Sequence, residues 1–524
     1  MPAAGVDRLR AVSRDGADTV IERERRQLPR DLEALLRLAP VTLDELLELH
    51  RRFSVSNAAD LAAALPHLTR PGGDPGAELG ARLRVALPSL RADRSRIPLG
   101  RAFTVLEAFV TAIVNQAGGR ADVEPVGSFR RLDDSVGDLS VLAVAPDPRT
   151  VLPIIAEACP DAEFLQRSDW AASVRFRSHE IHVRIELPEY ASCALVHYTG
   201  SPGHVRALGE LAASRGLSLT SRTLVDRASN RVIGCPTEES VYEALGIPFI
   251  EPEIRHGEDE VADARAGRLP NLVREDDIRG DLHAHTLWSD GQDTVEAVVR
   301  AARHLGYEYI AITDHSPHAA TSRTLDEARL LEQRAEVDRL RQRFPDIAIL
   351  QGIEVDIRPD GGLDLPDHAL EPLDIVLASL HDPAGQNRDQ LTARYLKAIR
   401  HPLVDVITHP TSRLVGRRDG LDIDVEAVFA AAVESATALE IDGAPAHLDM
   451  DGHLARKAID AGALVAIDSD AHRASSLGLQ MRLGIGTARR GRVTADRVLN
   501  AKPLGALRAW LAARRQRSRS LARA

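Results

Sequence analysis

The chain has 524 residues, of which 44% are hydrophobic, 27% charged and 3% aromatic, and its formal net charge is −11. This length exceeds what one hydrophobic core usually serves, so we expect two to four domains of an ordinary soluble globular protein. The scarcity of aromatic side chains argues against a protein that stacks many bases on exposed rings, and the negative charge excludes a polycation. Any contact with nucleic acid must therefore come from local basic surface.

The cysteines and the N-terminus indicate where the protein works. Cys159, Cys193 and Cys235 are scattered, so they do not form a thiolate zinc site of the usual spacing. The first twenty residues lack the apolar core of a signal peptide, and no run of eighteen apolar residues occurs. We therefore expect a cytoplasmic protein with no part in a membrane.

Residues 1–95 have a helical pattern, with apolar residues three and four positions apart in segments 28–38 and 42–53. The Gly- and Pro-rich stretch TRPGGDPG, at 69–76, predicts a loop between helices. Residues 96–200 combine a helix over 102–116 with four short strand-like runs. Residues 201–270 predict a small α/β region that ends in an acidic connector.

From residue 279 to 500 the pattern changes to seven short apolar runs, each followed by a helical stretch or a long connection. The runs are GDLHAH, YIAITDH, AILQGIEVDI, DIVLASLH, VDVITHP, ALEIDG and ALVAIDSDAH. Strands that alternate with helices predict a parallel sheet with crossover helices, and seven such units predict a closed or nearly closed barrel. Residues 501–524 are basic, and we expect a frayed tail there.

Six of the seven runs end in side chains that bind metals. These residues, with one loop aspartate after the first run, are His283, His285, Asp290, Asp314, His315, Glu354, His381, His409, Asp470 and His472. In a parallel barrel the strand ends open onto one face, so we expect most of these side chains to converge. Imidazoles and carboxylates in this number predict two or three divalent cations, and they suit Mn²⁺ or Zn²⁺, or Fe²⁺, better than Mg²⁺ alone.

Other polar residues of this half fall outside the pattern. We interpret six histidines as ordinary surface or loop residues: His304, His318, His368, His401, His447 and His453. Asp442 and Asp468 lie inside apolar runs, and we interpret them as structural.

The motifs DLHAHTLWSDG, ITDHS, GIEVDI, ASLH, THPTSR and SDAH resemble the PHP (polymerase and histidinol phosphatase) domain, in the form found at the C-terminus of bacterial family-X DNA polymerases. The resemblance implies nine ligands for three metals. Glu354 would bridge two metals, one completed by His283, His285 and Asp470 and the other by His381 and His409. Asp290, His315 and His472 would hold the third. The sequence departs from the family at Asp442, usually Asn, and at Ser412, usually Gly.

The resemblance implies phosphoester hydrolysis, for which we take Glu354, His381, Asp470 and Arg413 as the candidate catalytic residues. Bound cations would activate water and neutralise charge on the phosphoryl oxygens. Arg413 follows the His409 loop, and it is either a phosphate contact or a solvated loop arginine.

Residues 30–270 resemble the polymerase part of the same family, through GSFRRLDDSVGDLSVLAV from Gly127 onward. The fold class implied is multidomain: an α-helical N-terminal region, an α/β nucleotidyltransferase-like palm and a C-terminal (β/α)7 PHP barrel. The implied triphosphate contacts are Gly127, Ser128, Arg130 and Arg131.

The palm departs from its family at the metal-binding carboxylates. Asp138 holds the first acidic position, whereas Ser140 and His182 stand at the other two. Serine cannot bridge hard cations and histidine is a poor Mg²⁺ ligand, so we predict that the palm has lost its Mg²⁺ site and does not polymerise DNA. Tyr198 and Gly200 still resemble the nucleotide-pocket turn, which either binds a nucleotide or DNA end or is a remnant.

The resemblance also places DNA-binding helix-hairpin-helix turns in the N-terminal region, but Ala39, Pro40 and Val41 replace the glycine-rich turn. The second hairpin is replaced by TRPGGDPG. Arg130, Arg131 and the arginine-rich tail remain as candidate DNA contacts, although such a tail can serve solubility alone.

The leading interpretation is therefore a DNA-processing hydrolase: a 3′→5′ exonuclease, or an enzyme that trims 3′ ends or cleaves abasic sites. We expect DNA as its partner, a nucleotide as a second possible ligand and a monomeric state. One alternative is a small-molecule phosphoesterase of the histidinol-phosphatase kind. The other is a non-catalytic scaffold that binds DNA ends during repair.

Overall fold

The computed structural model describes residues 96–319 and 323–521 and, before them, residues 41–53, 79–80, 82–85 and the single positions 32, 35, 55, 61 and 65. The chain divides into two compact units, residues 1–96 and 97–524. Ala39, Pro40 and TRPGGDPG, on which the hairpin predictions rest, lie outside the described residues. No helix in the described part of the chain has the length and apolarity needed to span a bilayer.

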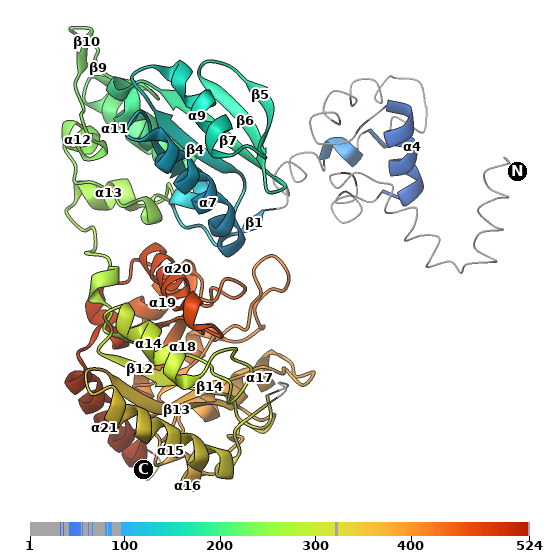
Figure 1. Cartoon of the computed structure of the whole chain (residues 1–524), viewed down its shortest axis with the longest axis vertical. Coiled ribbons are helices and arrows are strands. Elements are labelled where there is room, and N and C mark those ends of the chain that lie inside the picture. Colours follow the sequence, from blue (N-terminus) through green and yellow to red (C-terminus); the bar gives the residue numbers. More distant parts are fainter. Residues whose placement is uncertain are drawn as a thin grey trace, which may run out of the picture. The chain divides into compact units, whose positions relative to one another are not determined.

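The first unit contains helix α4 (Leu43–Phe53), in blue in Figure 1. Thr42 begins it with reciprocal hydrogen bonds: the Thr42 hydroxyl accepts from the Glu45 amide at 3.2 Å, and the Glu45 carboxylate accepts from the Thr42 amide at 2.7 Å. Leu46 and Leu49 of the helix are buried in a small leucine-rich cluster. The helical N-terminal region predicted from the apolar spacing is thus present.

The palm is a five-stranded sheet of order β2-β4-β7-β6-β5, in which only β4 and β7 run parallel. Its elements are α7 (Leu99–Ala117), β2 (Asp122–Val126), α8 (Gly127–Arg130), β4 (Leu139–Val144), α9 (Val151–Ala158), β5 (Glu163–Arg167), β6 (Ala171–Phe176), β7 (His179–Glu186) and α10 (Ala191–Thr199), with a short pair of β1 (Ile97–Pro98) and β3 (Ser135–Val136). Because side chains alternate along a strand, Val141 packs in the core with α7 and α9, whereas Leu142 packs under α10.

The small α/β region predicted over residues 201–270, to which we refer as the thumb, follows the palm and is drawn in green in Figure 1. It consists of α11 (Pro202–Ser214), the antiparallel strands β8 (Leu217–Leu219), β9 (Leu224–Asp226) and β10 (Arg231–Ile233), and helices α12 (Glu238–Ala244) and α13 (Glu260–Arg265). His204 is fully buried between two partners, with Nδ1 2.8 Å from Glu260 and Nε2 2.9 Å from the Tyr242 hydroxyl. Such a fully paired buried network fixes the packing of α11, α12 and α13.

The third part is the barrel predicted from the seven apolar runs. Its strands pair in parallel and in chain order: β11 (Gly280–Asp281), β12 (Tyr309–Ile312), β13 (Ala348–Asp356), β14 (Ile375–Ser379), β15 (Val406–Ile407), β16 (Ala438–Asp442) and β17 (Val465–Asp468). Its helices are α14 (Val295–His304), α15 (Glu327–Arg343), α16 (Asp367–Leu370), α17 (Arg388–Ile399), α18 (Val425–Ser435), α19 (Gly452–Asp460) and α20 (Leu477–Arg490).

The first and last strands of the barrel meet through side chains as well as backbone. Ala284 and Ala471 form a parallel bridge just beyond β11 and β17. The Leu282 amide donates to the Asp468 carboxylate at 2.9 Å, and the Ser469 amide donates to the Asp281 carboxylate at 3.2 Å. Buried carboxylates therefore supply the hydrogen bonds that complete a nearly closed seven-stranded barrel.

The expectation of a frayed C-terminal tail is wrong between Leu504 and Leu521, where the chain forms helix α21. Leu507 and Leu511 are buried against the barrel core, and the Arg514 guanidinium, 1% exposed, donates to the Asp405 carboxylate at 2.9 Å. Arginines that looked solvated thus hold the helix on the barrel. Arg514 is consequently removed from the candidate DNA contacts.

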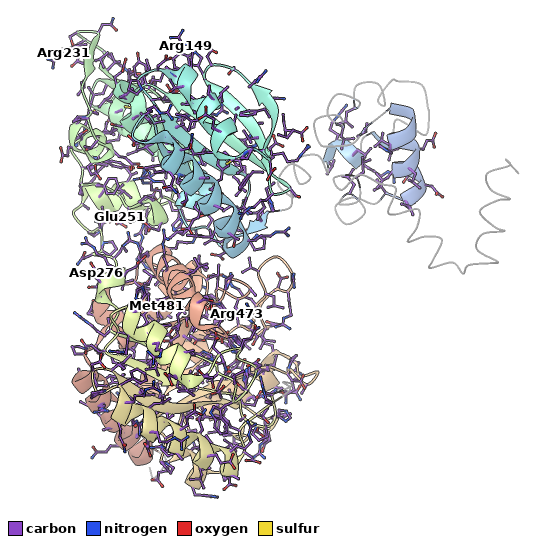
Figure 2. The ribbon with its side chains drawn as sticks, viewed as in Figure 1. Arg149, Arg231, Glu251, Asp276, Arg473 and Met481 are labelled. Carbon is purple, nitrogen blue, oxygen red and sulfur yellow. The ribbon has the colours of Figure 1, made fainter. Side chains whose placement is uncertain are left out.

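The palm and thumb contact the barrel through α20, on which Figure 2 labels Met481. Arg489 lies 3.2 Å from Glu251, also labelled there, and 2.8 Å from Glu253. Leu483 is buried in the hydrophobic core of the palm. The contact therefore combines an apolar centre with charged pairs around it.

Candidate metal centre

The ends of the barrel strands bring the predicted ligand residues into one place. His283 and His285 follow β11 two positions apart, so their side chains lie on the same side, and both are fully buried. Glu354 lies within β13, one residue along from Ile353 of the core, and is 1% exposed. Burial of this many titratable groups requires partners for them.

Glu354 occupies the centre of the cluster. Its carboxylate oxygens lie within 3.6 Å of ring nitrogens of five histidines: His315 Nδ1 at 2.8 Å, His409 Nε2 at 2.9 Å, His381 Nε2 at 3.4 Å, His283 Nε2 at 3.5 Å and His285 Nε2 at 3.6 Å. One carboxylate has too few lone pairs to serve five donors well, whereas a carboxylate that bridges cations is compatible with this many imidazoles around it.

A second group forms around Asp470. Its Oδ1 lies 3.0 Å from His285 Nε2 and 3.6 Å from His283 Nε2, and these two ring nitrogens are 3.0 Å from each other. Two imidazole nitrogens and a carboxylate oxygen that point at one position form the kind of donor set that holds a divalent cation.

A third group joins Asp290 with His472, His315 and His285. Asp290 Oδ2 lies 3.3 Å from His472 Nε2 and 3.5 Å from His315 Nε2, and Asp290 Oδ1 lies 3.8 Å from His285 Nδ1. His285 Nδ1 is buried without a hydrogen-bond partner, as is Glu354 Oε2. Buried polar atoms without a hydrogen-bond partner are costly unless a cation contacts them, so the residues fit bound metal ions.

His409 completes the nine predicted ligands. Three sets of described side chains have ligand atoms that all lie within 4.8 Å of one another, and His409 belongs to none of them; the sets are His285, Asp290, His315 and His472; His283, His285 and Asp470; and His315, Glu354 and His381. It contacts Glu354, and its backbone adopts φ 25°, in the left-handed region that L-residues rarely occupy. The His409 amide donates to Glu440 at 2.6 Å. That hydrogen bond favours the unusual backbone conformation that carries the imidazole to Glu354.

Two carboxylates that the sequence motifs did not single out orient the histidines. Glu440 Oε1 accepts from His283 Nδ1 at 2.6 Å, and Asp356 Oδ1 accepts from His381 Nδ1 at 3.0 Å. Each bond leaves the opposite ring nitrogen, Nε2, for the centre of the cluster, which is how metal-binding histidines are usually fixed. A buried acid inside an apolar strand was the signal in the sequence that could have revealed both.

The charges of this cluster shift the pKa values of its histidines. Burial alone would lower the pKa of His381, but the charge of Glu354 and the hydrogen bond to Asp356 outweigh it and raise the pKa to about 10. Burial also opposes protonation of His472, yet Asp290 and Asp470 raise its pKa to about 9. For His285, burial and the neighbouring imidazoles lower the pKa to about 3. Cations would take the place of these protons.

Asp314 precedes His315 and has a structural role. Its carboxylate accepts from the Thr286 amide and hydroxyl, both at 2.8 Å, and from the Ser289 hydroxyl at 2.5 Å. These bonds shape the turn that carries Asp290. Asp314, although it is a metal-capable residue at a strand end, therefore positions the predicted ligand Asp290 and is not a ligand itself.

His447 lies in a loop, as interpreted from the sequence, but it is not an ordinary solvated loop residue. Its ring stacks on that of His409, with 5.6 Å between centroids and 26° between planes. Burial, together with the neighbouring His409, lowers the pKa of His447 to about 4. A loop residue beyond β16 thus forms one wall of the centre, which no strand-end pattern indicates.

Arg413 is held away from solvent. Its Nη1 donates to Asp134 of the palm at 2.8 Å and its Nε to the carbonyl of His447 at 3.1 Å, and the side chain is 15% exposed. The guanidinium is therefore committed to a contact between palm and barrel, and neither sequence alternative, a phosphate contact or a solvated arginine, describes it.

In the palm, the three positions at which the resemblance implies carboxylates, Asp138, Ser140 and His182, lie close together. Ser140 on β4 is paired in register with His182 on β7, and the Ser140 hydroxyl donates to Asp138 at 2.5 Å. His182 Nδ1 lies 3.0 Å from the Ser173 hydroxyl. One carboxylate with a hydroxyl and an imidazole is a poor donor set for Mg²⁺.

The implied triphosphate contacts are occupied by the protein itself. Arg130 donates to Glu238 of the thumb at 2.8 and 3.0 Å, and Arg131 donates to the Thr199 carbonyl at 2.6 Å. Gly127 has φ 70° at the start of α8, and the hydroxyl of Ser128 accepts from the Gly137 amide at 3.3 Å. Arg130 thus joins palm and thumb in this conformation, whereas Arg131 is held within the palm.

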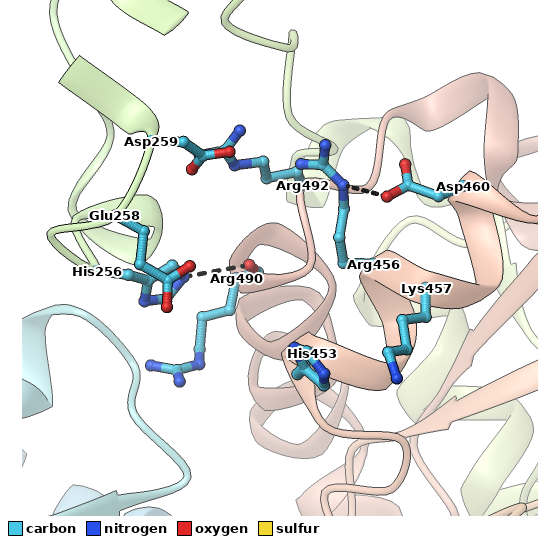
Figure 3. A pocket seen from close by; sticks show the side chains of 10 residues that line it. His256, Glu258, Asp259, His453, Arg456, Lys457, Asp460, Arg490 and Arg492 are labelled. Carbon is cyan, nitrogen blue, oxygen red and sulfur yellow. Dashed lines mark hydrogen bonds and ion pairs between the residues drawn. The ribbon is translucent and has the colours of Figure 1, made fainter. Parts of the chain in front are cut away.

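A separate cavity of about 630 Å³ lies between the thumb and the barrel (Figure 3). It is lined by His256, Glu258, Asp259, Gly452, His453, Arg456, Lys457, Asp460, Arg490 and Arg492. Arg456 donates to Asp460 at 2.8 Å and Arg492 to Asp263 at 2.6 Å. None of the lining residues is one of the nine predicted ligands, so the cavity does not belong to the metal centre.

Comparisons with known proteins agree with this division of the chain. A family model described as DNA polymerase beta thumb matches residues 194–256, and one described as PHP domain matches residues 281–442. "DNA polymerase/3'-5' exonuclease PolX" of Bacillus subtilis is 30% identical over 501 residues, which cover 95% of this chain and 87% of that protein.

Shorter relatives, which match less than half of this chain, have another name. A probable phosphatase of Thermoanaerobacter sp. is 32% identical over 231 residues, which cover 42% of this chain and 89% of the relative. A probable phosphatase of Shewanella halifaxensis is 33% identical over 244 residues, which cover 45% of this chain and 92% of the relative.

Proposed function

The chain belongs to the bacterial family-X DNA polymerases that carry a C-terminal PHP domain, and we propose that its barrel hydrolyses DNA phosphodiesters with bound metal ions while its palm does not polymerise DNA. The observation that carries the proposal is the convergence of five histidines on Glu354. The fold makes the chain a phosphoesterase of the PHP kind joined to a polymerase-X-like module.

The donor set suits two or three ions of Mn²⁺, Zn²⁺ or Fe²⁺. When bound, such ions supply positive charge to the phosphoryl oxygens and lower the pKa of water. Glu354 and Asp470 contribute the negative charge that retains the ions, and Glu440 and Asp356 hold His283 and His381 in the tautomer that presents Nε2. The burial of the ligands excludes bulk water from all but the outer side of the centre.

Three residues line the exposed side of this centre. His381, His472 and Asp290 are 29–35% exposed, whereas His283 and His285 are fully buried. Substrate therefore approaches across His381 and His472. We propose that Arg473, the exposed residue that follows His472 and is labelled in Figure 2, contacts a substrate phosphate.

DNA is supported as the substrate by the parts of the chain in front of the barrel. The thumb matches that of a DNA polymerase, and the relative that shares 95% of this chain is named a polymerase and 3′-5′ exonuclease. We therefore propose exonucleolytic removal of 3′ nucleotides, with 3′-end trimming or abasic-site cleavage as related reactions. Nucleotide binding by the palm and a monomeric state belong to the same proposal.

The second candidate is a small-molecule phosphoesterase. It is favoured by the probable phosphatases that match 42% and 45% of this chain. A non-catalytic DNA-end scaffold is disfavoured by the nine ligand residues, all of which retain the type that a metal centre requires.

The test is to incubate the Mn²⁺-loaded protein with 5′-labelled single-stranded, 3′-recessed and abasic DNA. His283→Ala is the inactive variant, and His304→Ala, an exposed histidine at the end of α14, is its matched control. Shortened products that disappear in His283→Ala but not in His304→Ala support the proposal. Release of phosphate from small phosphomonoesters without DNA cleavage would transfer the assignment to the second candidate.

A further inference from the structure

The loop that follows β16, residues 443–451, packs against the palm; we refer to it as the β16 loop. Leu448 is fully buried within the hydrophobic core of the palm. Pro445 packs against Gly100 of α7. A Cβ atom added to Gly100 would lie 2.2 Å from the Pro445 ring. The loop therefore has its apolar side chains in the palm, although it belongs to the barrel in sequence.

The same loop contacts the metal centre with its other residues. His447 stacks on His409, and the Asp449 carboxylate accepts from the Thr411 amide and hydroxyl, each at 2.9 Å. Asp449 is fully buried. The β16 loop thus contacts the segment that carries His409 at two points, one through a ring and one through a carboxylate.

Arg413 joins these two sets of contacts. It lies four residues after His409, and its guanidinium donates to the backbone carbonyls of both His447 and Leu448. The same guanidinium donates to Asp134 of the palm at 2.8 Å, with exposures of 15% for Arg413 and 20% for Asp134. An ion pair with so little exposure is more sensitive to loss of one partner than a surface pair.

We propose that the palm supports the metal centre, with Asp134 as a positioning residue that acts through Arg413 and the β16 loop on His409. Without the palm, Leu448 and Pro445 would face water, and Arg413 would lose the nearer of its two carboxylates, Asp134 at 2.8 Å, and keep only Asp451 at 3.6 Å. The wall that His447 forms against His409 would then lose its support. The palm, a polymerase-like module that has lost two carboxylates, thereby has a present use as a support for the barrel. This proposal rests on the proposed metal centre.

The effect should be visible in metal binding, without any substrate. Residues that orient metal ligands change affinity by about 10- to 100-fold when mutated, and residues one contact further away change it less. We expect Asp134→Ala to weaken Mn²⁺ binding about 3- to 10-fold in calorimetric titration of the full chain. Asp134→Glu, which keeps the carboxylate, should recover most of this loss.

Two controls separate positioning from general damage. Asp147→Ala removes another palm carboxylate in an exposed pair with an arginine, Arg149, and should leave Mn²⁺ affinity unchanged. The double variant Asp134→Ala/Arg413→Ala should bind Mn²⁺ no more weakly than Arg413→Ala alone, because Asp134 acts through Arg413. The absorption spectrum of the Co²⁺-substituted protein should also change in Asp134→Ala.

The outcomes can be told apart. If the wild type binds Mn²⁺ and Asp134→Ala binds it equally tightly, with an unchanged Co²⁺ spectrum, the proposal about the palm is overturned while the metal centre stands. If the wild type binds no divalent ion, both proposals are overturned.

Discussion

The barrel and the palm place polar residues in the same way but differ in what those residues can do. In each, side chains on neighbouring parallel strands meet at one point: Glu354 of β13 faces ligands from the other barrel strands, and Ser140 of β4 faces His182 of β7. The barrel retains a full set of anionic and imidazole donors. The palm has Asp138 as its one carboxylate among the three corresponding positions. Its strands pair in register all the same, because register depends on the apolar face and not on the polar one.

The largest effect that this comparison predicts is loss of hydrolysis on replacing the central carboxylate. Glu354→Gln keeps the shape of the side chain but removes the charge that five imidazoles face. We expect kcat for DNA cleavage to fall by about 10²- to 10³-fold or more. The control is Glu332→Gln, on the exposed face of α15, and unimpaired cleavage by Glu354→Gln would remove Glu354 from the centre.

A smaller effect is expected at the carboxylates that orient the histidines. Glu440→Gln can no longer accept a charge-assisted hydrogen bond from His283 Nδ1, now at 2.6 Å. Mn²⁺ affinity should fall by about 10- to 100-fold. Glu426→Gln, exposed on α18, should bind Mn²⁺ as the wild type does. Equal affinities in the two variants would show that Glu440 serves folding alone.

The palm offers the converse experiment, in which carboxylates are restored. The double variant Ser140→Asp/His182→Asp places three acids around one point on β4 and β7. We expect Mg²⁺-dependent nucleotide insertion on a primed template to become detectable, although slow. Two aspartates placed instead at the exposed positions Gln166 and Ser168 should have no effect. Insertion by the wild type would show that the palm has not lost its reaction.

The smallest effect concerns pH. The pKa values of His381 and His472 in the metal-free fold are raised to about 10 and about 9, above the ordinary value of 6.5. Protonation of these groups therefore stabilises the fold fully below pH 6.5, and the stabilisation is lost as pH rises toward 10. The Tm of the metal-free protein should fall by a few degrees between pH 7 and 10. The Tm of the Mn²⁺-loaded protein should rise relative to that of the metal-free protein over the same range. A metal-free Tm that rises over this range would contradict these pKa shifts.

The sequence was sufficient for the architecture of the barrel. Its seven apolar runs have the length of strands, and each is separated from the next by a helix, so their parallel order follows from their spacing. It also predicted that His283, His381 and His409 would converge, because strand ends share one face. These predictions depend only on local periodicity.

What the sequence did not show depends on contacts between distant segments. Glu440 occupies an ordinary strand position, and its role appears only when β16 brings it to His283, 157 residues away. His447 belongs to a loop whose path is set by the palm. In α21, Leu504, Leu507 and Leu511 have helical spacing, but the arginines after them obscured it. Each error arose where a polar residue was assigned to solvent.

The most direct test of the account uses one preparation of the full chain and one substrate. A 5′-labelled primer annealed to a longer template is incubated with Mn²⁺, Mg²⁺ and all four deoxynucleotides, so that hydrolysis and synthesis compete on the same 3′ end. We predict that the primer becomes shorter and that His283→Ala leaves its length unchanged. Extension of the primer would contradict the central claim that the barrel is active and the palm is not.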